Sequence, residues 1–207
     1  IPQPSFIGRF RLQKTDELLP ESRDSNNSVV LFLPAFNEED AVADCINRVP
    51  ATVCGLTVDC LVIDDASTDG TAIEAKQAGA EVISLETNQG LGAAVRIGLS
   101  EGVKRKSSAV IFADADGEYP PEELENLVNP IIQGKADYVV GSRFLGDIEF
   151  MRPHRRFGNH VLTKILSLIA RRKITDGQSG YRAFSPRAAS SAEVIHDFNY
   201  AQIITLD

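Results

Sequence analysis

Tryptophan is absent from this sequence, and cysteine is scarce. The three cysteines, Cys45, Cys54 and Cys60, are odd in number and lack CxxC or Cys/His spacing, so they indicate neither a disulfide framework nor a zinc site. We therefore expect the reduced cytosol as the location of the protein. No apolar run approaches the roughly 20 residues that span a bilayer, so the sequence predicts no membrane-spanning helix within this stretch.

Positive charge is in the minority, but it is concentrated. The formal net charge of -8 and the pI of about 5.0 argue against nucleic acid as a partner. Between Met151 and Thr175 there is no acidic residue, and the basic residues of this segment are Arg152, Arg155, Arg156, Lys164, Arg171, Arg172 and Lys173. This basic segment 151–175 is either a solvated face or a surface that meets phosphates or an anionic membrane.

The pattern of apolar runs predicts a single α/β domain. The first 28 residues are polar and without periodicity, and we expect an N-terminal extension there. Strands are expected at 29–36, 57–64, 80–85, 108–113 and 136–142, and helices at 37–49, 67–79, 90–100 and 121–133. Asn37 is expected to cap the first of these helices. Continuous apolar strands that alternate with helices predict a mostly parallel sheet sandwiched by helices.

Polar clusters follow four of the predicted strands: "PAFNEE", "DDASTDG", "ADADGE" and "GSR". Because ligands of such sheets bind at the carboxyl ends of the strands, we expect these clusters to form one site. Asp114, Asp116 and Glu118 repel one another without a cation, and carboxylates suit hard divalent ions, which favours a metal site. An EF-hand is excluded because Tyr119 stands where that loop requires glycine and because a strand precedes the acids.

Two of the predicted loops, at Asp65 and at Asn88–Gly98, can each be interpreted as a simple turn or as part of a nucleotide site. Asp65 is either a turn residue or the acceptor of a hydrogen bond from a ring nitrogen of a nucleobase. The stretch "NQGLGAAVRIG" (Asn88–Gly98) lies in the third βα unit, and its GxG is not followed by a third glycine at the offset that a dinucleotide fingerprint requires. We expect a tight turn with close helix packing there.

The order and spacing of the motifs resemble those of the family 2 glycosyltransferases. The motifs are "PAFNEE", "VIDDASTDGT", "NQGLGAAVRIGL", "ADADGEYPPEEL", "VVGSRF" and "TDGQSGYRAF". The chain looks most similar to the polyprenyl-phosphate sugar transferases, which resemble dolichyl-phosphate mannose synthase. The resemblance implies a GT-A (Rossmann-like) domain over residues 29–207, with its C-terminal part truncated, and a UDP- or GDP-sugar as donor.

The resemblance also implies roles for individual residues. Pro34, Ala35, Glu38 and Asp65 would line the nucleoside pocket. Asp114 would contact the nucleotide or share an ion, and Asp116 and Glu118 would bind Mg2+ or Mn2+. Arg143 would reach the phosphates. The family often has glutamine where Glu118 stands and tyrosine where Phe36 stands, so Glu118 adds a charge and Phe36 keeps a stacking face without the hydroxyl.

The acceptor is expected to be a polyprenyl phosphate. Relatives that make polysaccharides carry a Thr-Glu-Asp-like base motif and a Gln-x-x-Arg-Trp motif, and this sequence has neither. A phosphate is already an anion, so Asp176 would orient the acceptor, act as a base, buttress the site or simply cap a turn. Arg155, Arg156 and Ser179 would bind the acceptor phosphate. The predicted helix 161–170 is either core-facing or lies in the membrane interface, where it would bring the protein to the cytoplasmic face of a membrane.

Other functions remain as alternatives. A family 2 enzyme that acts on a saccharide or another hydroxyl acceptor would share most of these motifs. A nucleotide-sugar pyrophosphorylase should carry an early Gly-rich, Lys-bearing loop, and "VVLFLPAFNEE" has none. A catalytically silent binding module should have lost the acids or Arg143, and all are present.

Overall fold

The computed structural model describes residues 27–117, 119–141 and 179–194. Its elements alternate along the chain, as the apolar pattern predicts. The strands are β1 Ser28–Ala35, β2 Thr52–Val53, β3 Leu56–Asp64, β4 Glu81–Ser84, β5 Val110–Phe112, β6 Tyr138–Val140 and β7 Arg182–Phe184. The helices are α1 Val42–Asn47, α2 Thr71–Gln77, α3 Leu91–Lys104, the 3-10 turn η1 Pro121–Glu123, α4 Leu124–Ile132 and α6 Pro186–Ser191.

One sheet contains all the strands in the described ranges, in the order β2-β3-β1-β5-β7-β6, with β4 also pairing with β3. The pairs β1–β3, β1–β5 and β3–β4 are parallel. The register aligns Ala35 with Asp64, so the polar loops after β1 and β3 leave the sheet side by side. The mostly parallel α/β sheet is confirmed.

Two strands run against this direction, and neither was expected from the sequence. Strand β2 is a short antiparallel partner of β3, and β7 lies between β5 and β6, antiparallel to both. Strand β7 comes from "SGYRAF", a stretch with little apolar periodicity. Its insertion brings residues 179–181 next to the loop that follows β5.

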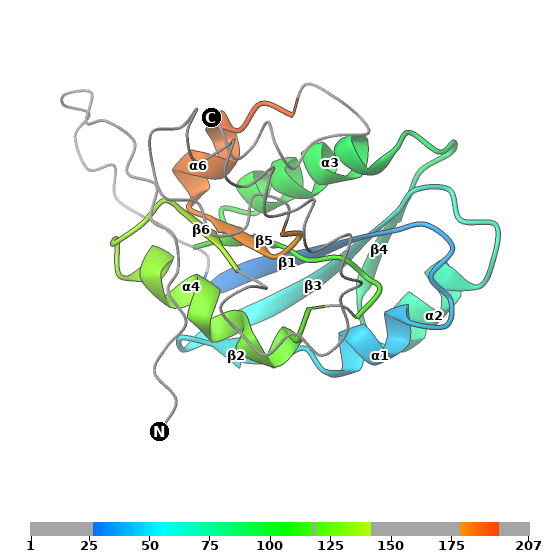
Figure 1. Ribbon diagram of the computed structural model, residues 1–207, viewed down its shortest axis with the longest axis horizontal. Coiled ribbons are helices and arrows are strands. Elements are labelled where there is room, and N and C mark those ends of the chain that lie inside the picture. The colour runs from blue at the N-terminus through cyan, green and yellow to red at the C-terminus, as the bar shows by residue number, and fades with distance from the viewer. Residues whose placement is uncertain (1–26, 118, 142–178, 195–207) are drawn as a thin grey trace, which may run out of the picture.

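Helices cover both faces of the sheet (Figure 1). The side chains of Leu31 and Leu33 pack with residues of α1, α2 and α4 on one face. Those of Val30 and Phe32 pack with α3 and α6 on the other. The alternation along β1 places successive residues on opposite faces, and both faces are apolar because both are covered.

Asn37 is not a helix cap, and this prediction was wrong. Helix α1 begins only at Val42, and its N-terminal flanking residue Ala41 makes no side-chain cap. Asn37 instead adopts a left-handed conformation with φ 57°. Its side-chain oxygen accepts a hydrogen bond from the Thr68 N–H at 2.9 Å. The oxygen that was expected to cap the helix therefore bonds to the loop after β3 instead.

The expected close packing of the helix after "NQGLG" is confirmed. A Cβ atom built on Gly98 of α3 would lie 2.2 Å from a ring carbon of Phe32 on β1. One on Gly102 would lie 2.4 Å from a methyl carbon of Val110 on β5. Glycine at these positions therefore lets α3 approach the sheet closely.

Several predicted segments lie outside the described residues. They are most of the N-terminal extension (1–26), the basic segment 151–175 and the predicted helix 161–170. Within the described ranges, each helix is too short or too polar to cross a bilayer.

Candidate functional site

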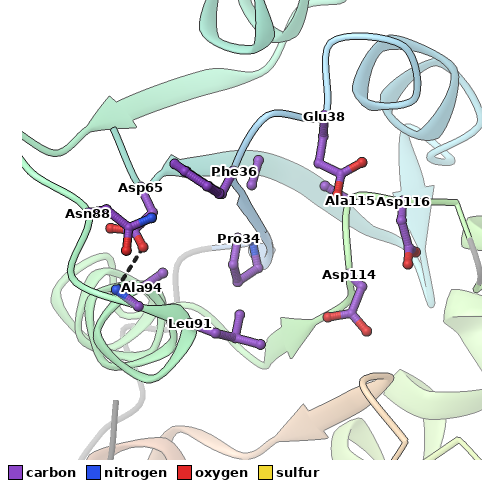
Figure 2. A pocket seen from close by; sticks show the side chains of 12 residues that line it. Pro34, Phe36, Glu38, Asp65, Asn88, Leu91, Ala94, Asp114, Ala115 and Asp116 are labelled. Carbon is purple, nitrogen blue, oxygen red and sulfur yellow. Dashed lines mark hydrogen bonds between the residues drawn. The ribbon is translucent and has the colours of Figure 1, made fainter. Parts of the chain in front are cut away.

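A cavity of about 340 Å³ opens at the carboxyl ends of β1, β3, β4 and β5. Its lining residues are Pro34, Ala35, Phe36, Glu38, Asp65, Asn88, Gly90, Leu91, Ala94, Asp114, Ala115 and Asp116. Figure 2 shows Asp65 at one end of the cavity and Asp114 and Asp116 toward the other. The cavity thus has two separate acidic ends with Pro34, Phe36 and Leu91 between them (Figure 2).

The loops after β1 and β3 hold each other in place. The backbone N–H of Glu38 donates to Thr71 Oγ1 at 2.8 Å, and Asn37 Oδ1 accepts from Thr68. Further bonds between these loops run from Asn37 N to Ser67 Oγ, from Glu39 N to Asp69 Oδ2 and from Gly70 N to Glu39 Oε2. Glu38, which lines the cavity, is therefore positioned by the neighbouring loop as well as by its own.

Asp65 organises the loop after β4. The residue is 4% exposed, and its carboxylate accepts hydrogen bonds from two successive backbone N–H groups, Gln89 at 2.7 Å and Gly90 at 2.8 Å. Its own N–H donates to the carbonyl oxygen of Ala35 at 2.9 Å. Each carboxylate oxygen has a second lone pair, so Asp65 retains the capacity to accept from a ligand. The structure therefore adds a structural role to the predicted contact with a base.

Negative charge gathers at the other end of the cavity. Burial raises the pKa of Glu38, and the nearby carboxylates of Asp116 and Asp69 raise that pKa further. No basic residue is among the described residues that line this cavity. Carboxylates in such a setting favour a bound cation.

A metal at this end would need more than the described side chains. In the parts of the chain that the structure describes, no group of three His, Cys, Asp or Glu side chains is arranged to hold an ion. Mg2+ typically takes only one or two carboxylates and completes its shell with substrate phosphates and water. Asp114 and Asp116 fit that pattern, and the third predicted ligand, Glu118, lies outside the described residues.

The structure brings together six of the residues that the sequence singled out. Pro34, Ala35, Glu38, Asp65, Asp114 and Asp116 all line the cavity. Ser179 is fully buried, and its Oγ accepts from the N–H of Tyr181 at 3.1 Å. Its role as a phosphate contact stays a prediction. Outside the described residues lie Glu118, Arg143, Arg155, Arg156 and Asp176.

One wall of the cavity, formed by the loop after β4 and the start of α3, was not predicted from the sequence. Asn88, Gly90, Leu91 and Ala94 line it, and they belong to the stretch that was interpreted only as a turn with helix packing. The available signal was position, because this stretch follows β4 and the carboxyl ends of parallel strands meet at one edge. Phe36 is 47% exposed on the cavity wall, as a stacking face requires.

A family model and several known proteins match this chain. The family model described as glycosyl transferase family 2 matches residues 30–191. This match includes every described element except the first two residues of β1.

Two relatives carry names that include a lipid phosphate or a polyprenol. The UDP-N-acetylglucosamine–dolichyl-phosphate N-acetylglucosaminyltransferase of Methanococcus voltae is 30% identical over an alignment of 179 residues, and the match covers 77% of this chain and 70% of that protein. The polyprenol monophosphomannose synthase of Mycolicibacterium smegmatis is 33% identical over an alignment of 166 residues, and the match covers 75% of this chain and 60% of that protein.

A solved structure shows the same fold. Glucosyl-3-phosphoglycerate synthase from Mycobacterium tuberculosis, in complex with Mn2+, UDP-glucose and phosphoglyceric acid, matches with a TM-score of 0.61 at 27% identity. The match covers 78% of this chain and 57% of that chain. The chain therefore spans about six to seven tenths of the length of these three proteins.

Proposed function

The chain belongs to glycosyl transferase family 2 and is a glycosyltransferase, and on that premise we propose that it transfers a sugar from a nucleoside diphosphate sugar to a polyprenyl phosphate. The observation that carries the proposal is one cavity that has a buried carboxylate at one end and paired acids at the other. A nucleotide-sugar has matching chemistry, since it joins a hydrogen-bonding base to a charged diphosphate.

The donor would lie along the cavity with its base toward Asp65. Phe36 offers an exposed ring for stacking, and Asp65 has acceptor capacity left beside its two backbone bonds. The diphosphate would then lie near Asp114 and Asp116 at the opposite end (Figure 2). The volume of about 340 Å³ is within the range of small-molecule sites, which starts at about 300 Å³.

Asp114 and Asp116 would hold Mg2+ or Mn2+, together with Glu118 as predicted from the sequence. The fit is supported by the surroundings of Glu38, whose pKa is raised first by burial and then by the nearby carboxylates of Asp116 and Asp69. A bound divalent ion supplies Lewis-acid stabilisation of the departing nucleoside diphosphate. The solved relative with Mn2+ and UDP-glucose supports the same metal class.

The acceptor is proposed from the names of the relatives and from the charge pattern. Two relatives are named for dolichyl phosphate and polyprenol substrates. The basic segment 151–175 would place Arg155 and Arg156 near an acceptor phosphate at the membrane surface, with Arg143 on the donor phosphates and Asp176 orienting the acceptor. In the transfer, an acceptor phosphate oxygen forms the bond to the anomeric carbon while the bond from that carbon to the diphosphate breaks. The nucleoside diphosphate leaves with the electron pair, and no hydroxyl proton has to be removed.

A transfer assay tests the proposal. Radiolabelled UDP-sugars and GDP-sugars are offered with Mn2+ and three acceptors: polyprenyl phosphate in vesicles, phosphoglyceric acid and soluble saccharides. We expect label on the lipid phosphate, and we expect EDTA or Asp116→Ala to abolish its transfer. Asp44→Ala is the matched control, because Asp44 lies on α1 with its side chain 75% exposed and lines no part of the cavity.

Other outcomes would separate the parts of the proposal. Label only on phosphoglyceric acid or a saccharide would overturn the lipid acceptor and keep the glycosyltransferase. Turnover that is unchanged in EDTA would overturn the metal role.

A further inference from the structure

Gly180 presses directly against the carboxylate of Asp114. A Cβ atom built on Gly180 would lie 2.1 Å from Asp114 Oδ2 and 2.8 Å from its Cγ. The φ angle of Gly180 is outside the left-handed region, so the backbone itself would accept another residue. Gly117 is the opposite case, because it has φ 74° and open space around it. Glycine is needed at 180 for the room it leaves to Asp114.

Tyr119 ties Gly180 to the loop that carries the acids. The backbone N–H of Gly180 donates to the hydroxyl of Tyr119 at 2.7 Å in a buried bond. Tyr119 is 6% exposed, and its ring centroid lies 5.5 Å from that of Tyr181. The residue that bounds Asp114 is thus bonded to the same loop, five residues further along the chain from Asp114.

The sheet fixes the other side of this contact. The N–H of Gly141 donates to the carbonyl oxygen of Tyr181 at 2.8 Å, at the end of β6. Arg182, the first residue of β7, is fully buried and donates to the carbonyl of Ser179 and the hydroxyl of Tyr138, both at 2.7 Å. Residues 179–181 are therefore held from three sides, by Gly141 at the end of β6, by the Tyr119 hydroxyl and by the buried guanidinium of Arg182.

We propose that Gly180 and Tyr119 are positioning residues that set the Asp114 carboxylate for binding the metal and diphosphate. The inference rests on the proposed function and adds residues to its site. A carboxylate that binds an ion at a fixed distance gains affinity when it is held in place beforehand, and residues behind metal ligands typically change metal affinity by about 10–100-fold. The segment that contributes β7 would in this way control the end of the cavity where Asp114 and Asp116 bind the diphosphate.

The test compares nucleotide binding with and without metal. UDP and GDP are each titrated by calorimetry into the 207-residue chain, once with saturating Mn2+ and once in EDTA. The ratio of the Kd in EDTA to the Kd with Mn2+ measures how far the metal contributes to nucleotide binding, and it lies above one when the metal strengthens binding. Gly180→Ala adds the clashing Cβ, Tyr119→Phe removes the hydroxyl that Gly180 bonds, and Tyr181→Phe is the matched control. The Tyr181 hydroxyl bonds only the partly buried carbonyl of Pro120 at 3.3 Å among the contacts described for it.

We expect the ratio to fall about tenfold in Gly180→Ala and in Tyr119→Phe, with the Kd in EDTA within about twofold of wild type. Tyr181→Phe should leave the ratio within about twofold. A general loss of structure would weaken both Kd values equally and would overturn the positioning role. A wild-type ratio above one with unchanged ratios in both variants would overturn this inference alone. A wild-type ratio of one for both nucleotides would overturn the metal-dependent function as well.

Discussion

Removal of the Asp65 carboxylate should destabilise the empty protein as well as weaken its nucleotide binding. Both carboxylate oxygens of Asp65 are already used by backbone N–H groups, of which that of Gly90 is in a buried bond and that of Gln89 in a partly buried one. In Asp65→Ala, water can reach the Gln89 N–H but not easily the Gly90 N–H. An unsatisfied buried donor costs about 1–3 kcal/mol, and hydrogen bonds to a charged group are worth about 1.5–3 kcal/mol each.

These figures predict a loss of about 2–3 kcal/mol in the free energy of unfolding. For a domain of this size, each kcal/mol shifts Tm by about 2–4 °C, so Tm should fall by about 4–12 °C. Asp65→Asn should also be destabilising, because its amide group turns one acceptor into a donor that faces a backbone N–H.

Differential scanning calorimetry of the ligand-free protein measures this shift, with Asp44→Ala as a control that should stay within about 1–2 °C of wild type. Nucleotide titration of the same variants then separates the two roles of Asp65. A Tm of Asp65→Ala equal to that of wild type would refute the structural role. If nucleotide affinity nevertheless fell, Asp65 would act through direct contact with the base alone.

Two further predictions concern packing and pH. Gly98→Ala should lower the free energy of unfolding by about 1–3 kcal/mol, because the added methyl group would overlap the Phe32 ring at 2.2 Å. Ser100→Ala, exposed on the same helix, should cost nothing, and equal Tm values for the two variants would contradict the packing argument. Arg105 donates to both carboxylate oxygens of Glu81, at 2.7 and 3.0 Å, and these bonds lower the pKa of Glu81 below its usual 4.5. The stabilisation is therefore present above pH 4.5 and lost as pH falls through the lowered pKa. Glu81→Gln should lower the free energy of unfolding at pH 7 by about 0.2–1 kcal/mol at most for this partly exposed pair, and the accompanying fall in Tm should become smaller in acid. A Tm difference that does not change with pH would show that the ion pair is not its cause.

Local pattern was sufficient where a feature depends on residues close in the sequence. The runs at 29–36 and 57–64 became β1 and β3 almost residue for residue, because β1 is buried throughout and β3 over its last four residues, and buried strands of such a sheet are mostly apolar. The polar groups after these strands met at one cavity because parallel strands end at the same edge. Asp65 and the acids at Asp114 and Asp116 could therefore be assigned to one site from the sequence alone.

The local sequence pattern did not predict the role of a residue whose partner lies on another loop. The short polar side chain of Asn37 suits a helix cap, but Thr68 on the neighbouring loop takes it. The glycines of "NQGLG" suit a turn, and the parallel pairing of β4 with β3 makes this turn a wall of the cavity as well.

The amino-acid pattern was enough to predict the parallel strands and the helices between them, the covered sheet and the edge at which the site lies, because each depends on periodicity or on residues that follow a strand directly. The entry of β7 into the sheet between β5 and β6 is visible only in the three-dimensional fold. That insertion brings Gly180 against Asp114 and lets it bond Tyr119, 61 residues away in the chain. Such a contact leaves no local pattern in the sequence. Glycine is required at position 180 because a Cβ atom would overlap the Asp114 carboxylate, and the backbone conformation of residue 180 does not itself require glycine.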